Sequence, residues 1–356
     1  MVKSRVAVVF GGTSVEREVS RVSARAILHG LGDAFDAIPI GMDASGRFRN
    51  ERDSRILLET GFGSLSPDAG GTDPWRIFQG VGIAFPIVHG EGGEDGTLQG
   101  FFETIGLPYV GSGVAGSALG MNKVAFKARM REAGIPVVRS ISISKGEWIS
   151  SAASLADSIA RRFPLPVFVK PSNGGSSLGI TKVKDWSALA EAARLAFEYD
   201  DAILVEEGID AREIETAILG NEEPEASGCA EIVPGREFYD YEDKYLADSA
   251  KLLVPAPLDE PFAREARATA IRAFLLAGCS GMARVDFFLD RRTGSLLLNE
   301  INTLPGFTAI SQYPRLWAEA GVSLPELLGR LVRLGFERSD ARRKAIERRG
   351  SPPKIA

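Results

Sequence analysis

The sequence predicts an α/β domain followed by α+β structure, arranged as two or three packed domains. In the first half of the chain, short β-branched runs alternate with helical patterns, which is typical of βαβ units. A compact unit of mixed strands and helices follows, and after it two strands are joined by a tight turn. The length of 356 residues exceeds what one hydrophobic core usually organises, so we expect several domains.

The first half supplies the alternating elements. Residues 42–74 contain five glycines and a weak apolar pattern, so we expect a surface excursion that does no chemistry. A single helix is expected over residues 117–133, because Gly134 and Pro136 follow it in the order that ends helices. A domain boundary is expected near Gly111. The other expected elements are strands at 5–10 and 82–88 and helices at 20–31 and 96–105.

The second half is expected to contain a hairpin and a long loop. A five-residue polar turn joins strands at 283–289 and 295–301, which predicts the hairpin. Residues 235–250 form a polar, aromatic loop of a length usual in lids or disordered segments. We expect a last helix at 325–333 and a frayed tail from Glu337, with seven basic and three acidic residues. The other expected elements are strands at 166–170, 202–206, 213–219 and 228–233 and helices at 151–162, 186–199 and 260–277.

Composition argues against several classes of protein. The net charge of -5 gives no basic surface for a polyanion, so nucleic acid is not an expected partner. No segment approaches the roughly 20 apolar residues that cross a bilayer, and the apolar run at 6–10 is too short for a signal peptide. We therefore expect a cytoplasmic protein without a membrane partner. Cys229 and Cys279 lack metal-ligand spacing, so we expect both to be reduced and buried.

Three oxygen-bearing side chains interrupt the apolar strands of the expected hairpin. Asp286 lies in one strand, while Glu300 and Asn302 lie two residues apart in the other and so share a face. Asp and Asn near strand ends are often only turn formers. Charges inside apolar strands, however, must be paired or metal-bound, and Mg²⁺ prefers oxygen ligands and completes its shell with water and phosphate oxygens. The pattern therefore indicates a magnesium site and implies a nucleotide.

A lysine ends one apolar strand and opens into a glycine-rich turn. The segment from Lys170 to Gly179 includes Ser176 and Ser177, and backbone N–H groups of such a turn can bind phosphate oxygens. The alternative is a flexible hairpin with an exposed lysine. The segment is neither a Walker A loop nor a dinucleotide-binding fingerprint. Lys123, on the preceding helix, would by itself be interpreted as a solvated lysine.

Two further segments follow strands of the first half. At 11–20 a strand passes through two glycines into a helix start, where free N–H groups and the helix dipole attract an anion such as a substrate carboxylate. A capping segment is the alternative. His89 follows the strand at 82–88, at the carboxyl end where open α/β sheets bind ligands. His29, inside a helical pattern, is expected to be structural.

Together these segments resemble the D-alanyl-D-alanine ligase family, from residue 5 to about residue 328. Five segments in the family's order carry the resemblance. They are GGTSVEREVS at 11–20, HGEGGEDGTLQG at 89–100, KPSNGGSSLG at 170–179, FYDYEDKY at 238–245 and NEINTLPGFT at 299–308. Departures are few: relatives often have a bulkier residue at Gly174, valine at Leu178 and, in some, lysine at Glu207.

The resemblance implies a three-domain ATP-grasp architecture with an N-terminal Rossmann-like domain, divided as 1–110, 111–208 and 209–356. It implies ATP bound between the last two domains with two Mg²⁺ ions, which Mn²⁺ could replace. The implied activity joins two D-alanine molecules through D-alanyl phosphate, which supplies peptidoglycan synthesis. A homodimer is usual in the family.

The resemblance also assigns residues to the two amino-acid substrates. Glu16 meets the ammonium group of the first D-alanine, with His89 nearby. Ser311 and the backbone at Gly306 hold the carboxylate of the second D-alanine. Arg284 stabilises the oxyanion.

The remaining implied roles concern the loop and the nucleotide. Lys244 and Tyr245 belong to the loop at 235–250, where Tyr245 links to Ser176 and Glu16 when the loop closes. The implied ATP-binding residues are Lys123, Lys170, Ser176, Ser177, Glu206, Glu207, Ile209 and Glu213, and the implied metal ligands are Asp286, Glu300 and Asn302.

Two other functions are weighed against this one. A ligase that uses D-lactate or D-serine as second substrate is the nearer, and Tyr245 argues against it because the resemblance links depsipeptide-forming relatives to other residues there. A nucleotide-sensing or amino-acid-binding protein without turnover would be favoured only if the metal and phosphate residues were broken, and they are intact.

Overall fold

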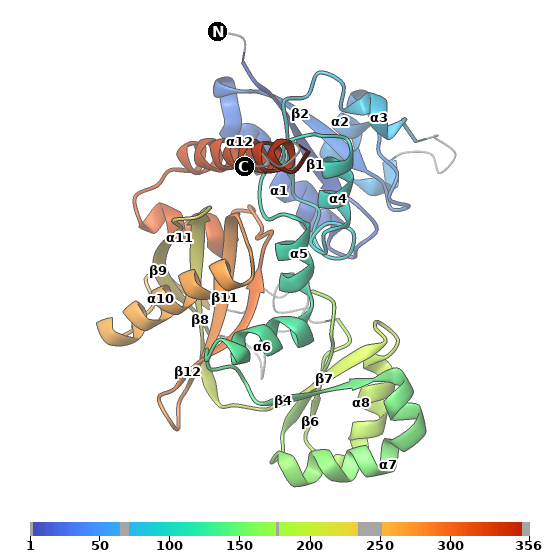
Figure 1. Cartoon of the computed structure of the whole chain (residues 1–356), viewed down its shortest axis with the longest axis vertical. Helices are drawn as coiled ribbons and strands as arrows, with labels where there is room; N and C mark the ends of the chain where they lie inside the picture. Colours follow the sequence, from blue (N-terminus) through green and yellow to red (C-terminus); the bar gives the residue numbers. More distant parts are fainter. Residues whose placement is uncertain (1–2, 65–70, 176–177, 234–250, 351–356) are drawn as a thin grey trace, which may run out of the picture.

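The chain folds around three β-sheets that follow one another along the long axis of the molecule (Figure 1). The computed structural model describes residues 3–64, 71–175, 178–233 and 251–350. A three-stranded sheet lies at one end, a five-stranded sheet in the middle and a four-stranded sheet at the other end. The predicted combination of α/β and α+β structure is confirmed.

The three-stranded sheet is parallel, with β1 at its centre. Every residue of β1 after Arg5 is buried, as expected for a strand covered on both faces. The strand β2 is absent from the sequence-based expectations, because it contains Pro39 and Gly41, which both disfavour strands. The elements are β1 (Arg5–Gly11), α1 (Arg17–Leu31), η1 (Gly32–Ala34), β2 (Asp36–Met42), β3 (Ile83–Pro86) and α4 (Thr97–Thr104).

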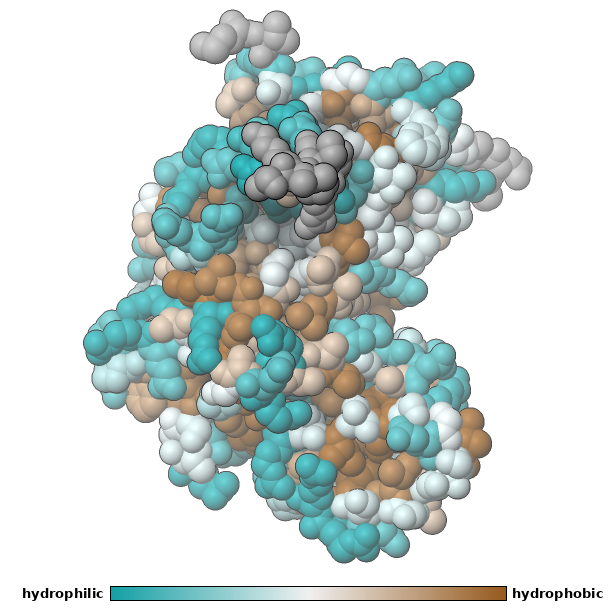
Figure 2. Space-filling view, viewed as in Figure 1, coloured by the Kyte–Doolittle hydropathy of each residue, from teal (hydrophilic) through white to brown (hydrophobic). Residues whose placement is uncertain are grey.

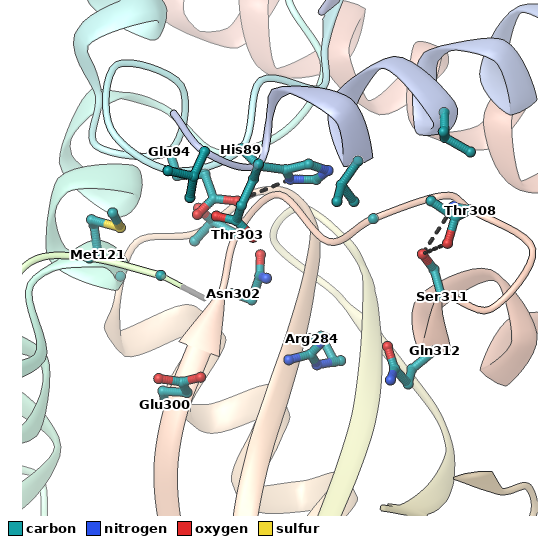
Figure 3. Close-up of a pocket in the computed structure, with 18 of the residues that line it drawn as sticks. His89, Glu94, Met121, Arg284, Glu300, Asn302, Thr303, Thr308, Ser311 and Gln312 are labelled. Carbon is teal, nitrogen blue, oxygen red and sulfur yellow. Dashed lines mark hydrogen bonds and ion pairs between the residues drawn. The ribbon is translucent and has the colours of Figure 1, made fainter. Parts of the chain in front are cut away.

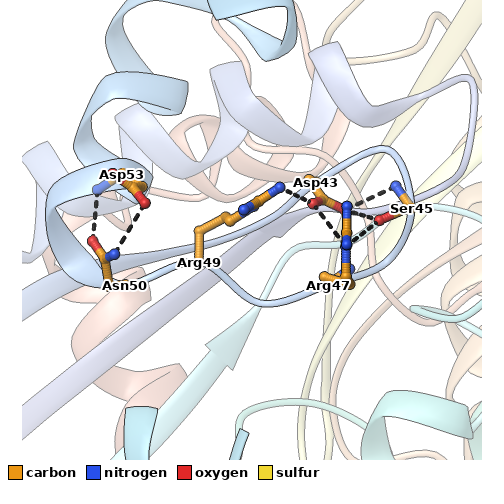
Figure 4. Close-up of polar contacts among 6 residues, drawn as sticks. All are labelled: Asp43, Ser45, Arg47, Arg49, Asn50 and Asp53. Carbon is orange, nitrogen blue, oxygen red and sulfur yellow. Dashed lines mark hydrogen bonds and ion pairs between the residues drawn. The ribbon is translucent and has the colours of Figure 1, made fainter. Parts of the chain in front are cut away.

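The described part of the surface excursion expected at residues 42–74 contains short helices and local polar contacts that were not predicted. Arg49 is buried and ion-paired with Asp43, whose carboxylate also accepts the backbone N–H of Ser45 at 2.8 Å (Figure 4). Asn50 then caps α2 by accepting a backbone N–H of the first turn at 2.9 Å. Local polar bonds, which an apolar pattern does not reveal, give this segment its order. The elements are α2 (Glu51–Thr60), η2 (Phe62–Ser64) and α3 (Pro74–Ile77).

The single helix expected at 117–133 is wrong, because two helices occupy this stretch. Asn122 has an extended backbone and caps the second helix, accepting the backbone N–H three residues further on at 2.8 Å. The break places Lys123 at the first position of a helix, where its N–H donates to the carbonyl of Ser172 at 2.8 Å. The helices are α5 (Val114–Met121) and α6 (Lys123–Glu132).

The four-stranded sheet is antiparallel, in the order β4-β7-β5-β6, and has its own apolar core with α7 and α8. The helix α7 begins at residue 145, where Ser144 and Glu147 form a capping box. The non-helical backbone of Ser151 makes a kink, and the part after this kink corresponds to the helix predicted at 151–162. The elements are β4 (Ser140–Ser144), α7 (Lys145–Arg162), β5 (Val167–Pro171), β6 (Thr181–Val183), η3 (Trp186–Ala188), α8 (Leu189–Ala196) and β7 (Ala202–Glu207).

The five-stranded sheet contains the predicted hairpin. Its order is β10-β9-β8-β11-β12, and β11 pairs antiparallel with both β8 and β12. Cys229 and Cys279 are free and buried beside this sheet, as predicted. The elements are β8 (Ala211–Gly220), β9 (Glu225–Val233), β10 (Lys251–Leu253), α10 (Glu260–Leu276), β11 (Gly281–Asp290) and β12 (Leu296–Asn302).

The expected frayed tail is wrong, because residues from Glu337 to 350 continue the last helix. The Arg338 guanidinium carbon stacks 4.0 Å from the ring centroid of Tyr109, and Arg342 forms an ion pair with Glu103 at 2.6 Å. The helix therefore runs back onto the N-terminal part of the chain, and hydrophilic residues cover its outer side (Figure 2). Across the described residues, no helix has the length and apolar character needed to span a bilayer. The last helices are α11 (Gln312–Glu319) and α12 (Leu324–Gly350).

Candidate active site

Two neighbouring cavities, of about 610 and 560 Å³, lie between the sheets. The first cavity is bordered by the start of α1, the loop after β3 and the segment after β12. The second cavity lies between the four-stranded and five-stranded sheets. Lys123, Arg284 and Glu300 line both cavities, so the two spaces meet at these side chains.

His89 and Glu94 form a buried pair in the wall of the first cavity (Figure 3). His89 Nδ1 lies 3.3 Å from Glu94 Oε1. Burial lowers the pKa of His89, but the carboxylates of Glu94 and Glu16 outweigh burial and raise this pKa. Burial raises the pKa of Glu94. Glu16 lines the same cavity, so the structure brings together His89 and Glu16, which come from different segments of the sequence.

Hydrogen bonds through Ser20 hold α1 against the sheet. Its hydroxyl accepts the N–H of Gly11 at 2.8 Å and donates to the carbonyl of Ile87 at 2.5 Å. Gly11 has a φ of 97°, and a Cβ there would lie 2.1 Å from the carbonyl oxygen of Met42, so the turn requires glycine. Glu16 is the N-cap residue of α1, but its side chain makes no capping hydrogen bond. The side chain of Glu16 therefore does not serve as the cap of this helix.

The segment after β12 brings Gly306 and Ser311 together. Ser311 Oγ accepts the N–H of Thr308 at 2.9 Å, and a Cβ on Gly306 would lie 2.8 Å from the same oxygen. The N–H of Phe307 donates to Ser23 Oγ on α1 at 3.1 Å, which ties this segment to the N-terminal part. Gly306 and Ser311 both line the first cavity beside the start of α11 (Figure 3).

Four polar side chains lie on one face of the β11–β12 hairpin. In the strand register, Asp286 is opposite Glu300 and Arg284 is opposite Asn302. The prediction that Asp286, Glu300 and Asn302 come together on this hairpin agrees with that register. Arg284 Nε and Nη2 donate to the two carboxylate oxygens of Asp286 at 2.8 and 2.7 Å, and Nε lies 3.2 Å from Glu215 Oε1. Burial lowers the pKa of Arg284, but these carboxylates outweigh burial and raise it. The guanidinium is therefore fully charged.

A buried ion-pair cluster forms one wall of the second cavity. Lys170 is ion-paired with Glu206, and Lys127 Nζ lies 2.6 Å from the other oxygen of the same carboxylate. Burial raises the pKa of Glu206, but the two lysines outweigh it and lower the pKa to about 2. Lys123 Nζ donates to the carbonyl of Gly174 in the glycine-rich turn. The predicted ATP-binding residues that line this cavity are Lys123, Lys170, Glu206, Glu207, Ile209 and Glu213.

Four of the predicted site residues lie outside the described part of the chain, and the sequence did not predict several side chains of the cavities. Ser176, Ser177, Lys244 and Tyr245 lie outside the described residues. Glu215 alternates with Glu213 in an apolar strand, the same signal that identifies Glu300 and Asn302. Side chains in or behind the cavities that the sequence did not single out include Glu94, Lys127, Glu215 and Gln312.

Comparison with known proteins identifies the family to which the chain is similar. The model of the D-ala D-ala ligase N-terminus matches residues 5–112, and that of the D-ala D-ala ligase C-terminus matches residues 129–333. The chain is 43% identical to a D-alanine–D-alanine ligase of Chlorobium phaeovibrioides over 93% of this chain and 97% of the relative. A D-alanine–D-alanine ligase of Acetivibrio thermocellus is 42% identical over 94% and 96%.

Solved structures give the same result. The D-alanine–D-alanine ligase of Coxiella burnetii superposes with a TM-score of 0.84 at 34% identity, covering 97% of this chain and 98% of that one. The VanG D-Ala:D-Ser ligase of Enterococcus faecalis gives a TM-score of 0.82 at 34% identity, with coverage of 94% and 99%. The chain therefore belongs to the D-alanine–D-alanine ligase family and has the ATP-grasp fold of that family.

Proposed function

We propose that this protein joins two D-alanine molecules to D-alanyl-D-alanine for peptidoglycan synthesis, converting ATP to ADP and phosphate. Ligases of this family use ATP and D-alanine as substrates. The observation that carries the proposal is the meeting of the two cavities at Lys123, Arg284 and Glu300. A nucleotide in the second cavity would present its last phosphate to an amino acid in the first.

The polar face of the β11–β12 hairpin fits Mg²⁺. Oxygen ligands come from three side chains, those of Asp286, Glu300 and Asn302. The negative charges of the carboxylates around Arg284 exceed its single positive charge. Among the described residues, no group of three His, Cys, Asp or Glu side chains is arranged to hold a metal ion. The proposed set differs from such a group because its third ligand is the amide oxygen of Asn302. We infer that these three residues hold two Mg²⁺ ions, which Mn²⁺ could replace. When bound, Mg²⁺ supplies positive charge that offsets the charge of the ATP phosphates.

In the first step, this chain orients ATP and the first D-alanine. Lys123 and Lys170 neutralise phosphate charge, and Glu16 binds the ammonium group of D-alanine, with His89 beside it. A carboxylate oxygen of D-alanine then attacks the γ-phosphorus, and the bond from that phosphorus to the bridging oxygen breaks. D-Alanyl phosphate and ADP result. Such a transfer depends mainly on positioning and on charge neutralisation.

In the second step, the amine of the second D-alanine attacks the carbonyl carbon of D-alanyl phosphate. Ser311 and the backbone at Gly306 hold its carboxylate, while Arg284 and the Gly306 N–H stabilise the oxyanion that forms. The second D-alanine attacks as the neutral amine, after its ammonium group has given one proton to solvent. Phosphate leaves with its electron pair and takes up the proton that the attacking amine releases. Water must be excluded meanwhile, since it would hydrolyse the acyl phosphate. By resemblance we assign closure to the loop at 235–250.

The loop roles also stay proposals. Lys244 and Tyr245 would act from this loop, with Tyr245 linked to Ser176, and Ser177 would bind phosphate. We propose domains at 1–110, 111–208 and 209–356, a homodimer, and a cytoplasmic location where ATP and D-alanine are both available.

A second acceptor, D-serine, is favoured by one observation. Gln312 lines the first cavity beside Ser311 (Figure 3), and within the described part of the chain its amide makes no hydrogen bond. An amide with free hydrogen-bonding capacity could bind the hydroxyl of D-serine. The similar structure from Enterococcus faecalis is a D-Ala:D-Ser ligase.

The proposed function is tested with purified protein, ATP, Mg²⁺ and D-alanine. We expect one phosphate released for each D-alanyl-D-alanine identified by mass, and no product from L-alanine. Phosphate release without dipeptide would instead indicate an ATPase, and binding without release would indicate a sensor.

A further inference from the structure

Lys127 completes a buried cluster of three charges behind the second cavity. Its Nζ lies 2.6 Å from one oxygen of Glu206, while Lys170 is ion-paired with the other oxygen. The side chains of Lys127 and Glu206 are each 2% exposed, whereas that of Lys170 is 12% exposed. The carboxylate therefore lies between a lysine on α6 and a lysine on β5.

The two lysines differ in what they face. Lys170 lines the second cavity together with Glu206, whereas Lys127 is not among the side chains that line either cavity. A ligand in the second cavity would touch Lys170 and Glu206 directly. Lys127 would influence that ligand through Glu206.

The different roles of Lys170 and Lys127 follow from the free-energy cost of an unpaired buried charge. In the proposed function, Lys170 binds the phosphates of ATP. A lysine that turns toward phosphate loses its ion pair with Glu206. A buried carboxylate left without a partner is strongly unfavourable. A second lysine that remains in place removes this penalty.

We propose that Lys127 is a positioning residue of the nucleotide site, which holds the Glu206 carboxylate in place so that Lys170 is free to bind phosphate. This inference rests on the proposed binding of ATP in the second cavity. An ionised carboxylate only accepts hydrogen bonds. Glu206 lines the second cavity, so we place the base of the nucleotide beside it as part of this proposal. A carboxylate held there would favour adenine, which has an amino group, over hypoxanthine, which has a carbonyl oxygen at that position.

The test measures binding of ADP and of inosine diphosphate to the full chain by calorimetry, without D-alanine. Lys127→Met removes the charge but keeps the length of the side chain. We expect ADP to bind about tenfold more weakly and the preference for ADP over inosine diphosphate to fall. Lys127→Arg should restore both in part. The matched control is Lys145→Met, which removes a lysine 48% exposed and paired with Asp201 at 3.5 Å, and it should leave both unchanged.

A double variant decides whether Lys127 acts through Glu206. Glu206→Gln alone and the pair Lys127→Met with Glu206→Gln should show the same ratio of ADP to inosine diphosphate affinity. A further change in the double variant would overturn the inference, as would an unchanged ratio in Lys127→Met. If Lys127→Met does not fold, the double variant, which loses one charge of each sign, gives the same decision. A wild-type chain that binds no ADP would overturn the proposed function, and the inference with it.

Discussion

The guanidinium of Arg284 donates to both carboxylate oxygens of Asp286, two residues further along the same strand. While both oxygens accept from Arg284, Asp286 cannot offer them fully to a metal ion. The guanidinium also lies 3.2 Å from Glu215, a second buried carboxylate. If this hairpin holds Mg²⁺ as proposed, Asp286 would have to turn from Arg284 toward the metal, and Glu215 would keep Arg284 in place.

Asp286→Asn should raise the Mg²⁺ concentration for half-maximal activity. The amide has the shape of the carboxylate but lacks its charge, so an increase of about tenfold or more is expected. The measurement is a Mg²⁺ titration of dipeptide synthesis at saturating ATP. An unchanged titration would remove Asp286 from the metal ligands.

Glu215→Gln should lower kcat while leaving KM for ATP near its wild-type value. Without this charge, Arg284 loses one of the carboxylates that hold it, and we expect a loss of about tenfold in kcat. The matched control is Glu231→Gln in the neighbouring strand. Glu231 is also buried and makes a bidentate pair with Arg212, at 2.8 and 2.7 Å, but does not line the cavities. Equal effects of the two substitutions on kcat would show that Glu215 matters only for stability.

Gln312→Leu should reduce the use of D-serine as second substrate. Loss of one neutral hydrogen bond corresponds to about 1 kcal/mol, or roughly fivefold. In competition between equal D-alanine and D-serine, the fraction of D-alanyl-D-serine, measured by mass spectrometry, should fall by about that factor. Formation of D-alanyl phosphate, trapped with hydroxylamine, should stay unchanged. A constant product ratio would contradict a role for Gln312 in acceptor choice.

The stability of the chain should depend on Glu206 in acid. Its pKa is lowered from 4.5 to about 2, so the charged carboxylate stabilises the fold fully above pH 4.5. This contribution is lost as the pH falls toward 2. The unfolding free energy of wild type minus that of Glu206→Gln should therefore shrink between about pH 4.5 and pH 2, measured by urea titration. A difference independent of pH would show that Glu206 is not held ionised.

Local patterns predicted the parts of the site that lie on one element or one hairpin. The two-residue period of β12 places Glu300 and Asn302 on a shared face, and the register brings Asp286 opposite. The sequence pattern could not show that Lys127 contacts Glu206. These residues lie on α6 and β7, which are far apart in the sequence and meet only in the folded chain. Residues 117–133 have a continuous helical pattern, so the sequence did not reveal that Asn122 breaks the helix and caps the one that follows.

The elements that the sequence missed share a cause. Pro39 lies inside β2, where strand propensity fails but parallel pairing to β1 on one edge holds the strand. The charged end of α12 lacks an apolar stripe, and its contacts with Tyr109 and Glu103 come from residues more than two hundred positions away. Such tertiary contacts override local propensity and are not visible in one sequence.

In the proposed reaction, a D-alanine carboxylate oxygen passes to the phosphate of ATP where the two cavities meet. The most direct measurement uses D-alanine with both carboxylate oxygens labelled as ¹⁸O, unlabelled ATP and Mg²⁺, with mass spectrometry of the products. We expect one ¹⁸O in each phosphate released and one in the peptide carbonyl of each dipeptide. Dipeptide formed with unlabelled phosphate would contradict it.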